Sequence, residues 1–248
     1  MRRETQNILL ILLGGALLKL ALTGEYVRYV KPVHQPWVIG GGAIMLTLGL
    51  LAIWRDLLQG ARETAGHTDG SAGEPHAHSS RSSWMLLVPV LTVLLVAPPA
   101  LGSDAVQRSQ ARGSQGQSSG RQDAAFPPLP AGEAVPLTVS EFAARAGWDD
   151  TGALDGRIVS LSGFVVHRGE RVYLARMVIG CCAADASPVT VLLGGKPAAE
   201  SARLADDQWI EVTGTLVPGS SSEQTGYVPE LTVDSVRPIG QPADPYEH

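Results

Sequence analysis

Three long apolar stretches in the first hundred residues constrain the fold of this chain more than any other feature of its sequence. They cover residues 7–23, 37–54 and 84–101, and each is about as long as the helix of roughly 20 residues that crosses a bilayer. The second and third contain no charged side chain, and Trp37 and Trp54 flank the second as interfacial anchors do. Because none has a polar face, the sequence predicts three transmembrane helices rather than amphipathic helices of a soluble core.

The first stretch leaves a second interpretation open, since an apolar run after MRR is also typical of a cleavable signal peptide. The run continues past Leu13 without a clear small-residue cleavage site, which favours a retained helix, and Lys19 lies near its end, where the side chain can reach the interface. The basic residues that flank the three stretches favour, by five to four, an N-terminus inside the cytoplasm. We therefore expect residues 102–248 to lie outside it.

A polar loop over residues 55–83 contains His67, His76 and His78. Imidazole is a common metal ligand, so one hypothesis is a metal-collecting loop. The other is a solvated connector, because this histidine spacing, without cysteines or clustered carboxylates, fits no closed structural metal site. Residues 102–136 are rich in glycine, serine, glutamine and proline and are predicted to form a flexible linker between the membrane region (1–101) and the C-terminal region (137–248).

Residues 137–248 are predicted to form one small, all-β domain with short helices. A helix follows Ser140, and then alternating patterns predict three strands, a helical patch and two more strands. This order is typical of a five-stranded Greek-key barrel of the OB type, although an antiparallel sandwich has similar periodicities. Gly163 and Gly214 lie inside predicted strands, where barrel closure requires bulges or sharp bends. The expected fold is mixed and membrane-anchored: three transmembrane helices and an OB-like barrel.

Charge argues against the nucleic-acid binding that an OB-like barrel could otherwise suggest. The formal net charge of the chain is −5, and acidic residues outnumber basic ones over 102–248. A nucleic-acid site needs a basic groove with stacking aromatic side chains. We therefore expect no nucleic-acid partner.

The adjacent pair Cys181 and Cys182, the only cysteines of the chain, is its most unusual local motif. Consecutive strand residues point to opposite faces, so both thiols can serve one site only in a turn, which Gly180 permits. With Asp185, and with His167 as a hypothetical further ligand, the thiols would form a soft-metal site for Zn or Cu(I). The alternatives are two buried, inert thiols or a vicinal disulfide in an oxidising compartment.

Enzyme motifs are absent from the sequence: it has no GxSxG, HExxH, phosphate-binding glycine loop or GxGxxG after a strand. A thiol nucleophile would need a positioned histidine, and His167 is the one candidate inside the domain. We therefore predict no catalytic residues and no certain cofactor.

Six segments carry a resemblance to a known family: the histidine-bearing loop, the third apolar stretch running into PPALGSDAVQR, DGRIVSLSGFVV, CCAADASPV, WIEVTGTL and the terminal PYEH. Together they resemble the YcgQ-like family of bacterial multi-pass membrane proteins. The resemblance covers nearly the whole chain and implies a protein of the bacterial cell membrane that is usually paired with a predicted multi-spanning permease. It implies no reaction, so Cys181, Cys182 and Asp185 are carried over as signature positions alone.

Two functions remain in competition at this point. The first is an accessory subunit of a membrane transport system, embedded in the lipid bilayer beside a permease, with an extracytoplasmic domain that senses a ligand or a metal ion. The second is an extracytoplasmic thiol-redox protein that uses the pair Cys181 and Cys182.

Overall fold

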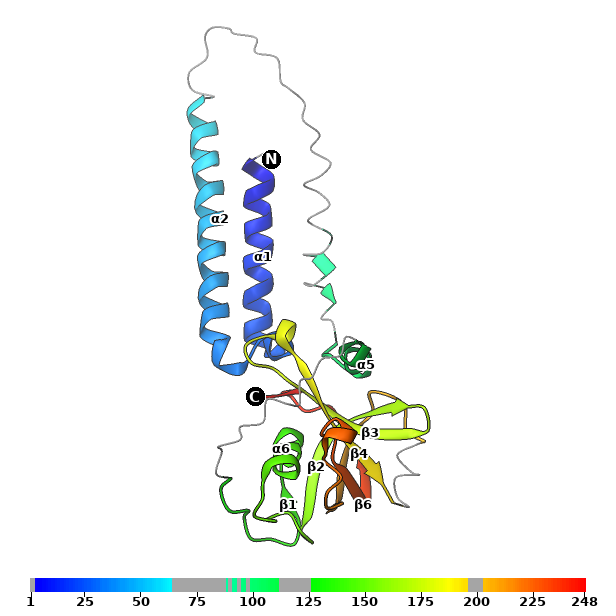
Figure 1. The fold of residues 1–248 in the computed structure, drawn as a ribbon. Helices are drawn as coiled ribbons and strands as arrows, with labels where there is room; N and C mark the ends of the chain where they lie inside the picture. Colours follow the sequence, from blue (N-terminus) through cyan, green and yellow to red (C-terminus); the bar gives the residue numbers. More distant parts are fainter. Residues whose placement is uncertain are drawn as a thin grey trace. The chain divides into compact units, whose positions relative to one another are not determined.

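The computed structural model describes residues 3–63, 88, 91–92, 95–96, 99–111, 126–195 and 203–248. The chain divides into two compact units, Met1–Pro99 and Ala100–His248 (Figure 1). The first is built from helices, and the second is a sheet domain with short helices.

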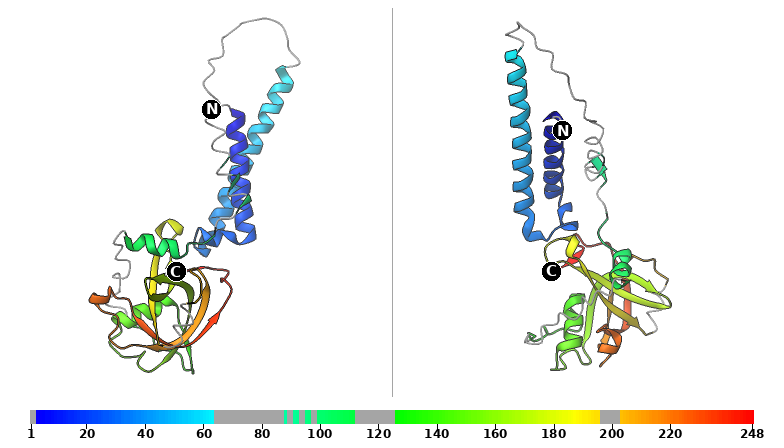
Figure 2. Two further views of the ribbon diagram at one scale, coloured as in Figure 1. Left: turned by 90° about the vertical axis from the view of Figure 1, so that its right-hand side faces the viewer. Right: turned by 45° about the horizontal axis from the view of Figure 1, so that its top comes forward.

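Two long helices, α1 (Arg3–Thr23) and α2 (Gln35–Glu63), form a hairpin in the first unit (Figures 1 and 2). The 3-10 turns Glu25–Arg28 and Pro32–His34 connect them. Glycines allow the helices to approach closely: a Cβ atom on Gly14 would lie 2.9 Å from the carbonyl oxygen of Gly42. Such contact through small residues is typical of helices that associate in a membrane.

Within the described residues, two helical stretches are long and apolar enough to cross a membrane, Gln6–Thr23 and Pro32–Asp56. Only 28% of the first and 11% of the second is buried, whereas a core helix of a soluble protein would be mostly buried. By length and composition the pair indicates membrane association, and the first stretch fits a signal sequence equally well.

Most of the third predicted span, residues 84–101, lies outside the described residues. Two hydrogen bonds are described there: the hydroxyl of Thr92 donates to the carbonyl of Val88, and the amide of Val96 donates to the carbonyl of Thr92, both at 2.8 Å. Both have the i to i+4 spacing of an α-helix.

Five long strands of the second unit pair in a closed ring. They are β2 (Ile158–Arg168), β3 (Arg171–Val178), β4 (Ser187–Gly194), β5 (Trp209–Leu216) and β6 (Glu230–Pro238). The ring runs from β2 through β3, β4, β6 and β5 back to β2, and β4 with β6 is its parallel pair. Two short strands extend the sheet in parallel, β1 (Val135–Pro136) beside β2 and β7 (Tyr246–Glu247) beside β3. The five predicted strands are therefore all present; the helical patch predicted between the third and fourth is described from residue 203 onward, where it forms turns.

The two strand glycines lie where β2 changes partner and where β5 has the predicted irregularity. β2 changes partner at Phe164, from β5 to β3, and a Cβ atom on neighbouring Gly163 would lie 2.6 Å from the carbonyl oxygen of Ala175. In β5 the register against β6 shifts at Gly214, where a Cβ atom would lie 2.2 Å from the carbonyl oxygen of Thr232. Any larger residue at either position would push the paired strands apart.

The interior of the ring is filled by alternate strand residues and covered by α6 (Val139–Trp148), whose Phe142 is fully buried. The helix cap differs from the prediction, which placed it at Ser140. Thr138 is the cap, and its hydroxyl accepts a hydrogen bond from the amide of Glu141 at 3.0 Å. Ser140 lies inside the helix, where its amide and hydroxyl donate to Glu247.

Helix α5 (Ser103–Ala111) corrects the prediction that the linker begins at residue 102. Val106 of this helix is fully buried in a second apolar cluster, on the face of β2 and β3 that points away from the ring interior. Asp207 anchors the helix, because its carboxylate accepts hydrogen bonds from the amide (2.6 Å) and hydroxyl (2.9 Å) of Ser103. Asp104, Gln107 and Arg108, whose polar side chains contribute to the linker prediction, are exposed on this helix. Residues 112–125 of the predicted linker lie outside the described residues.

A fragment that begins at Ala100 is therefore expected to unfold at a higher temperature than one that begins at residue 137, because the shorter fragment exposes the apolar cluster around Val106. Thermal unfolding followed by circular dichroism measures the difference. Val106→Ala in the longer fragment should cost about 1–3 kcal/mol and move its melting temperature toward that of the shorter one. Equal melting temperatures for the two fragments would show that α5 does not stabilise the domain.

Candidate metal-binding site

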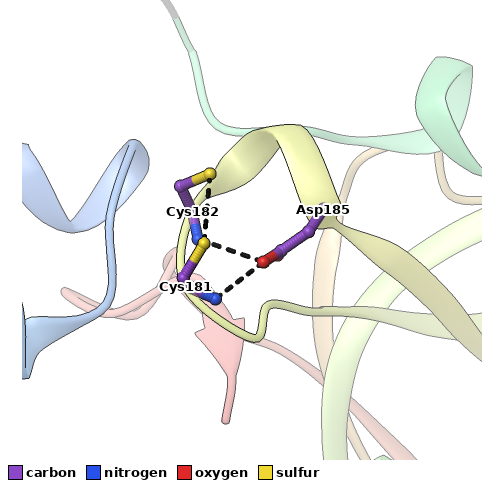
Figure 3. A group of neighbouring side chains, drawn as sticks. All are labelled: Cys181, Cys182 and Asp185. Carbon is purple, nitrogen blue, oxygen red and sulfur yellow. Dashed lines mark hydrogen bonds between the residues drawn. The ribbon is translucent and has the colours of Figure 1, made fainter.

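The two cysteines lie in the connection between β3 and β4, just past the end of a strand, as the sequence predicts. β3 ends at Val178, and the 3-10 turn η3 (Ala183–Asp185) begins directly after the pair. Cys181 is exposed and Cys182 is half-buried, so neither thiol belongs to the apolar core. Their Sγ atoms are 3.5 Å apart on the same side of the turn (Figure 3).

Asp185 holds the turn in shape through its carboxylate. One oxygen accepts a hydrogen bond from the amide of Cys181 at 2.7 Å, and the other accepts one from the amide of Gly180 at 3.0 Å. The amide of Asp185 in turn donates to the carbonyl of Cys182 at 3.0 Å. The thiol of Cys181 also donates to the carboxylate (Figure 3). These bonds fix both sulfur atoms on one short loop.

The turn gathers three groups that can bind a metal ion. The ligand atoms of Cys181, Cys182 and Asp185 all lie within 4.8 Å of one another, and among the described residues they are the group of this kind that the structure brings together. Structural zinc sites are closed by four protein ligands, whereas sites that exchange ligands keep a position open. A turn with two thiols and one carboxylate supplies fewer than four ligands, so as a zinc site it would be of the second kind.

The carboxylate of Asp185 also sets the protonation of the nearer thiol. The hydrogen bond with Asp185, and after it the hydrogen bond with the thiol of Cys182, raise the pKa of Cys181 to about 11, because both favour the neutral thiol. The same hydrogen bond and the backbone amides lower the pKa of Asp185. At neutral pH Cys181 is therefore protonated, and a metal ion that binds its sulfur must displace the proton.

Asp185→Asn is accordingly expected to lower the pKa of Cys181 toward its ordinary value, since the negative charge beside the thiol is removed. In a Cys182→Ser background, iodoacetamide should then alkylate Cys181 on the order of tenfold faster near pH 8. Mass spectrometry of the alkylated peptide across pH 7–11 gives the titration curve. Asp206→Asn is the control, because it removes a carboxylate that contacts His167 and not the thiols. An unchanged titration curve for Asp185→Asn would show that Asp185 does not raise the pKa of Cys181.

The structure does not bring His167, the one predicted histidine that it describes, to the thiols. His167 lies at the far end of β3, where it pairs with Val172 in the hairpin and its Nδ1 contacts Asp206 at 2.8 Å. The eight residues of β3 separate this hairpin from the cysteine turn. The loop histidines lie outside the described residues: His67, His76 and His78.

Sequence reasoning missed the segment that lies beside the cysteine turn, the C-terminal strand β7. Its Tyr246 pairs with Met177 and its Glu247 with Val178, and the amide of Ile179 donates to the carbonyl of Glu247 at 3.0 Å. A strand of two residues has no periodicity that could reveal it. The terminal PYEH contributed to the family resemblance, but nothing in it indicated which strand it would join.

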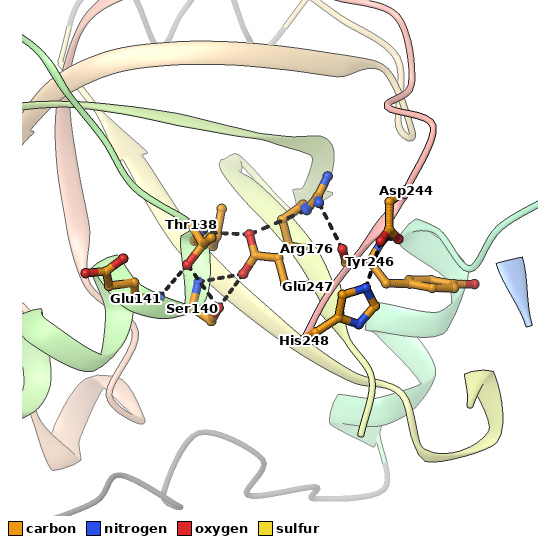
Figure 4. A network of polar contacts seen from close by, with 9 residues as sticks. Thr138, Ser140, Glu141, Arg176, Asp244, Tyr246, Glu247 and His248 are labelled. Atoms are coloured by element: carbon orange, nitrogen blue, oxygen red, sulfur yellow. Dashed lines mark hydrogen bonds and ion pairs between the residues drawn. The ribbon is translucent and has the colours of Figure 1, made fainter. Parts of the chain in front are cut away.

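The carboxylate of Glu247 continues from this strand into a buried network (Figure 4). It accepts hydrogen bonds from the amides of Val139 and Ser140, both at 2.9 Å, and from the hydroxyl of Ser140. Arg176 lies 3.5 Å away through its Nε and donates from Nη2 to the carbonyl of Tyr246 at 3.3 Å. The cysteine turn is thus connected through β7 to the first turn of α6.

Fold and site together define a class: a protein with two long apolar helices near its N-terminus and a closed-ring sheet domain that displays a dithiol turn. Residues 5–112 match the DUF1980 N-terminal domain, and residues 149–248 match the DUF1980 C-terminal domain. The two matches together span most of the chain, which therefore belongs to the DUF1980 family. The dithiol turn and β7 both lie in the C-terminal match.

Other comparisons add little. Among curated proteins, none matches this sequence. Among solved structures, the crystal structure of asparaginyl-tRNA synthetase from Pyrococcus horikoshii complexed with asparaginyl-adenylate resembles 37% of this chain, with a TM-score of 0.23 and 16% sequence identity. This chain spans 22% of that protein, and a similarity at this score carries no argument about function.

Proposed function

We propose that this protein is a membrane-anchored metal-binding protein that serves as an accessory subunit of a membrane transport system. The observation that carries the proposal is the turn itself, where the sulfur atoms of the exposed Cys181 and the half-buried Cys182 lie 3.5 Å apart, with Asp185 beside them. Two sulfurs held together at a surface are suited to take up a thiophilic ion and to release it again.

The spacing of the sulfur atoms favours a tetrahedral ion such as Zn²⁺ over a linear Cu(I) ion. Two sulfurs on one tetrahedral zinc, with bonds of about 2.3 Å, are about 3.8 Å apart. Two sulfurs on opposite sides of a linear ion with similar bonds would be about 4.6 Å apart. The two sulfurs are 3.5 Å apart in the hydrogen bond between Cys181 and Cys182, so a tetrahedral ion would move them apart less than a linear one.

The membrane part of the proposal extends what the helices support. We propose that α1, α2 and the segment 84–101 cross the bilayer of a bacterial cell as three spans and contact a multi-spanning permease. The glycine contacts between α1 and α2 and their exposed apolar side chains support a membrane environment. The closed ring of β2–β6 supports an OB-like barrel, which we place outside the cytoplasm.

A thiol-redox function remains the alternative, and the protonation of Cys181 argues against it. Thiol–disulfide exchange proceeds through the thiolate, and redox-active cysteines usually have a lowered pKa. Here the carboxylate of Asp185 raises the pKa of Cys181 to about 11. A metal ion overcomes this barrier by binding the sulfur as the proton leaves, whereas a nucleophilic thiol has no such help.

Titration of the full-length, reduced protein in detergent separates the two functions. We expect one Zn²⁺ or Cd²⁺ per chain, with release of protons and, for Cd²⁺, the ultraviolet charge-transfer band of a thiolate complex. The band distinguishes the cysteine turn from the loop histidines, which give none. Absence of the band, together with reversible cycling between dithiol and disulfide, would replace metal binding with the redox function.

The orientation is tested in intact cells with Ser118→Cys in a Cys181→Ser, Cys182→Ser background. Residue 118 follows the third predicted span in the sequence, so an extracytoplasmic C-terminal domain predicts labelling by a membrane-impermeant maleimide. Labelling that requires permeabilised cells would reverse the orientation.

A further inference from the structure

A histidine paired with a carboxylate lies on the strand next to the cysteine turn. Because β7 runs parallel to β3, with Tyr246 opposite Met177 and Glu247 opposite Val178, the next residue, His248, comes beside Ile179. Two residues further along the β3 side is Cys181. The register therefore brings the imidazole of His248 to the end of the sheet where the thiols stand.

The imidazole is held in the manner of many metal-binding histidines. Its Nε2 contacts the carboxylate of Asp244 at 2.8 Å, and the other oxygen of that carboxylate accepts a hydrogen bond from the amide of Tyr246 at 3.2 Å (Figure 4). Histidines that bind metals usually donate one ring N–H to a carboxylate, which fixes the ring and directs the other nitrogen at the ion. In His248 the nitrogen left for an ion is Nδ1.

The cysteine turn needs such a nitrogen ligand. Both oxygens of Asp185 already accept hydrogen bonds from amides of the turn, so the carboxylate maintains the geometry of the loop and is a poor third ligand. Cys181 is exposed and Cys182 is half-buried, so a further ligand would reach the sulfurs from the solvent side. A donor from the adjacent strand would not have to replace the hydrogen bonds that Asp185 makes to the amides of the turn.

We infer that His248 supplies the nitrogen ligand of a Cys₂His site whose sulfurs are Cys181 and Cys182, with Asp244 as the residue that positions its ring. The inference rests on the proposed metal binding and deepens it. In this structure the ligand atoms that lie within 4.8 Å of one another are those of the two thiols and Asp185. The imidazole of His248 therefore has to move toward the sulfurs when the ion binds. Three protein ligands leave the fourth position of a tetrahedral ion for water or for a ligand from a partner.

Two substitutions test the inference in the full-length protein in detergent, with Zn²⁺ and Co²⁺ as probes. His248→Gln keeps a side chain that can donate to Asp244 but removes the imidazole, and should weaken Zn²⁺ binding on the order of 100-fold. Asp244→Asn should weaken it about 10- to 100-fold, the usual effect of losing the residue that orients a metal-binding histidine. For His248→Gln the visible bands of bound Co²⁺ should shift, while the thiolate charge-transfer band persists.

The matched control is His167→Gln, which alters the other histidine–carboxylate pair of the domain, at the opposite end of β3. It should leave Zn²⁺ affinity and the Co²⁺ spectrum unchanged. If His248→Gln behaves like this control while cysteine substitutions abolish binding, the inference is overturned and the proposed metal binding stands. The inference is overturned as well if His248→Gln lowers the affinity only with a lower melting temperature of the metal-free protein and an unshifted spectrum. If the unaltered protein shows no thiolate band, the proposed metal binding and the inference about His248 are both wrong.

Discussion

Replacement of Cys181 and Cys182 by serine is expected to abolish the thiolate-bound metal and to leave the metal-free protein as stable as before. Both side chains lie at the surface of a turn, so a serine hydroxyl there stays solvated and costs little, whereas in an apolar core it would cost about 1–3 kcal/mol. Either single substitution should lower Cd²⁺ affinity by at least about tenfold and reduce the charge-transfer band, because one of two sulfur ligands is lost. Isothermal titration and differential scanning calorimetry on the same samples measure both effects.

Ala183→Ser serves as the matched control for the serine substitutions, since it adds a hydroxyl to the same turn without removing a sulfur. It should bind Cd²⁺ as the unaltered protein does. If the cysteine variants melt far below the parent and the parent itself shows no thiolate band, the thiols are structural residues and the site hypothesis is wrong.

The strands of the sheet domain were predictable because their evidence is local. In β5, Ile210 and Val212 alternate with Glu211 and Thr213, and this alternation alone predicts a half-buried strand. The cysteine turn was predictable for the same reason, since its two sulfurs and its carboxylate lie within five residues of one another in the sequence. Features whose evidence is contained in one segment can be inferred without the structure.

Contacts between distant segments were not predictable from the sequence. The sequence groups His167 with the thiols because both lie next to β3, but sequence spacing does not show that His167 lies at the opposite end of that strand. The polar sequence of α5 predicts a linker, and only its contact with β2 and β3 shows that Val106 is buried. Both errors arise where tertiary contacts, rather than local pattern, decide the structure.

Glu247 is the residue where the missed contacts matter most for stability, because one carboxylate serves three elements. Its side chain is 6% exposed, and it accepts hydrogen bonds from the first amides of α6, at the end of the helix where a negative charge is favoured. It also lies against Arg176, whose side chain is 9% exposed and whose guanidinium carbon lies 4.9 Å from the centre of the Trp209 ring. Burial lowers the pKa of Arg176, and the negative charges of Glu247 and Asp244 oppose that shift.

Glu247→Ala is therefore expected to destabilise the sheet domain by about 3–5 kcal/mol, since it removes the nearer counter-charge of a buried guanidinium and leaves two helix amides without an acceptor. Chemical unfolding of the fragment that begins at Ala100, followed by tryptophan fluorescence, measures the change in free energy. Arg176→Met isolates the ionic part: Glu247 still accepts from the helix, so this variant should lose less than Glu247→Ala. In the double variant no buried guanidinium remains to lose its partner. The decrease in the free energy of unfolding should therefore be smaller than the sum of the two single decreases by about 1 kcal/mol or more. Additive losses, or a Glu247→Ala variant as stable as the parent, would show that the carboxylate only fills space at the end of β7.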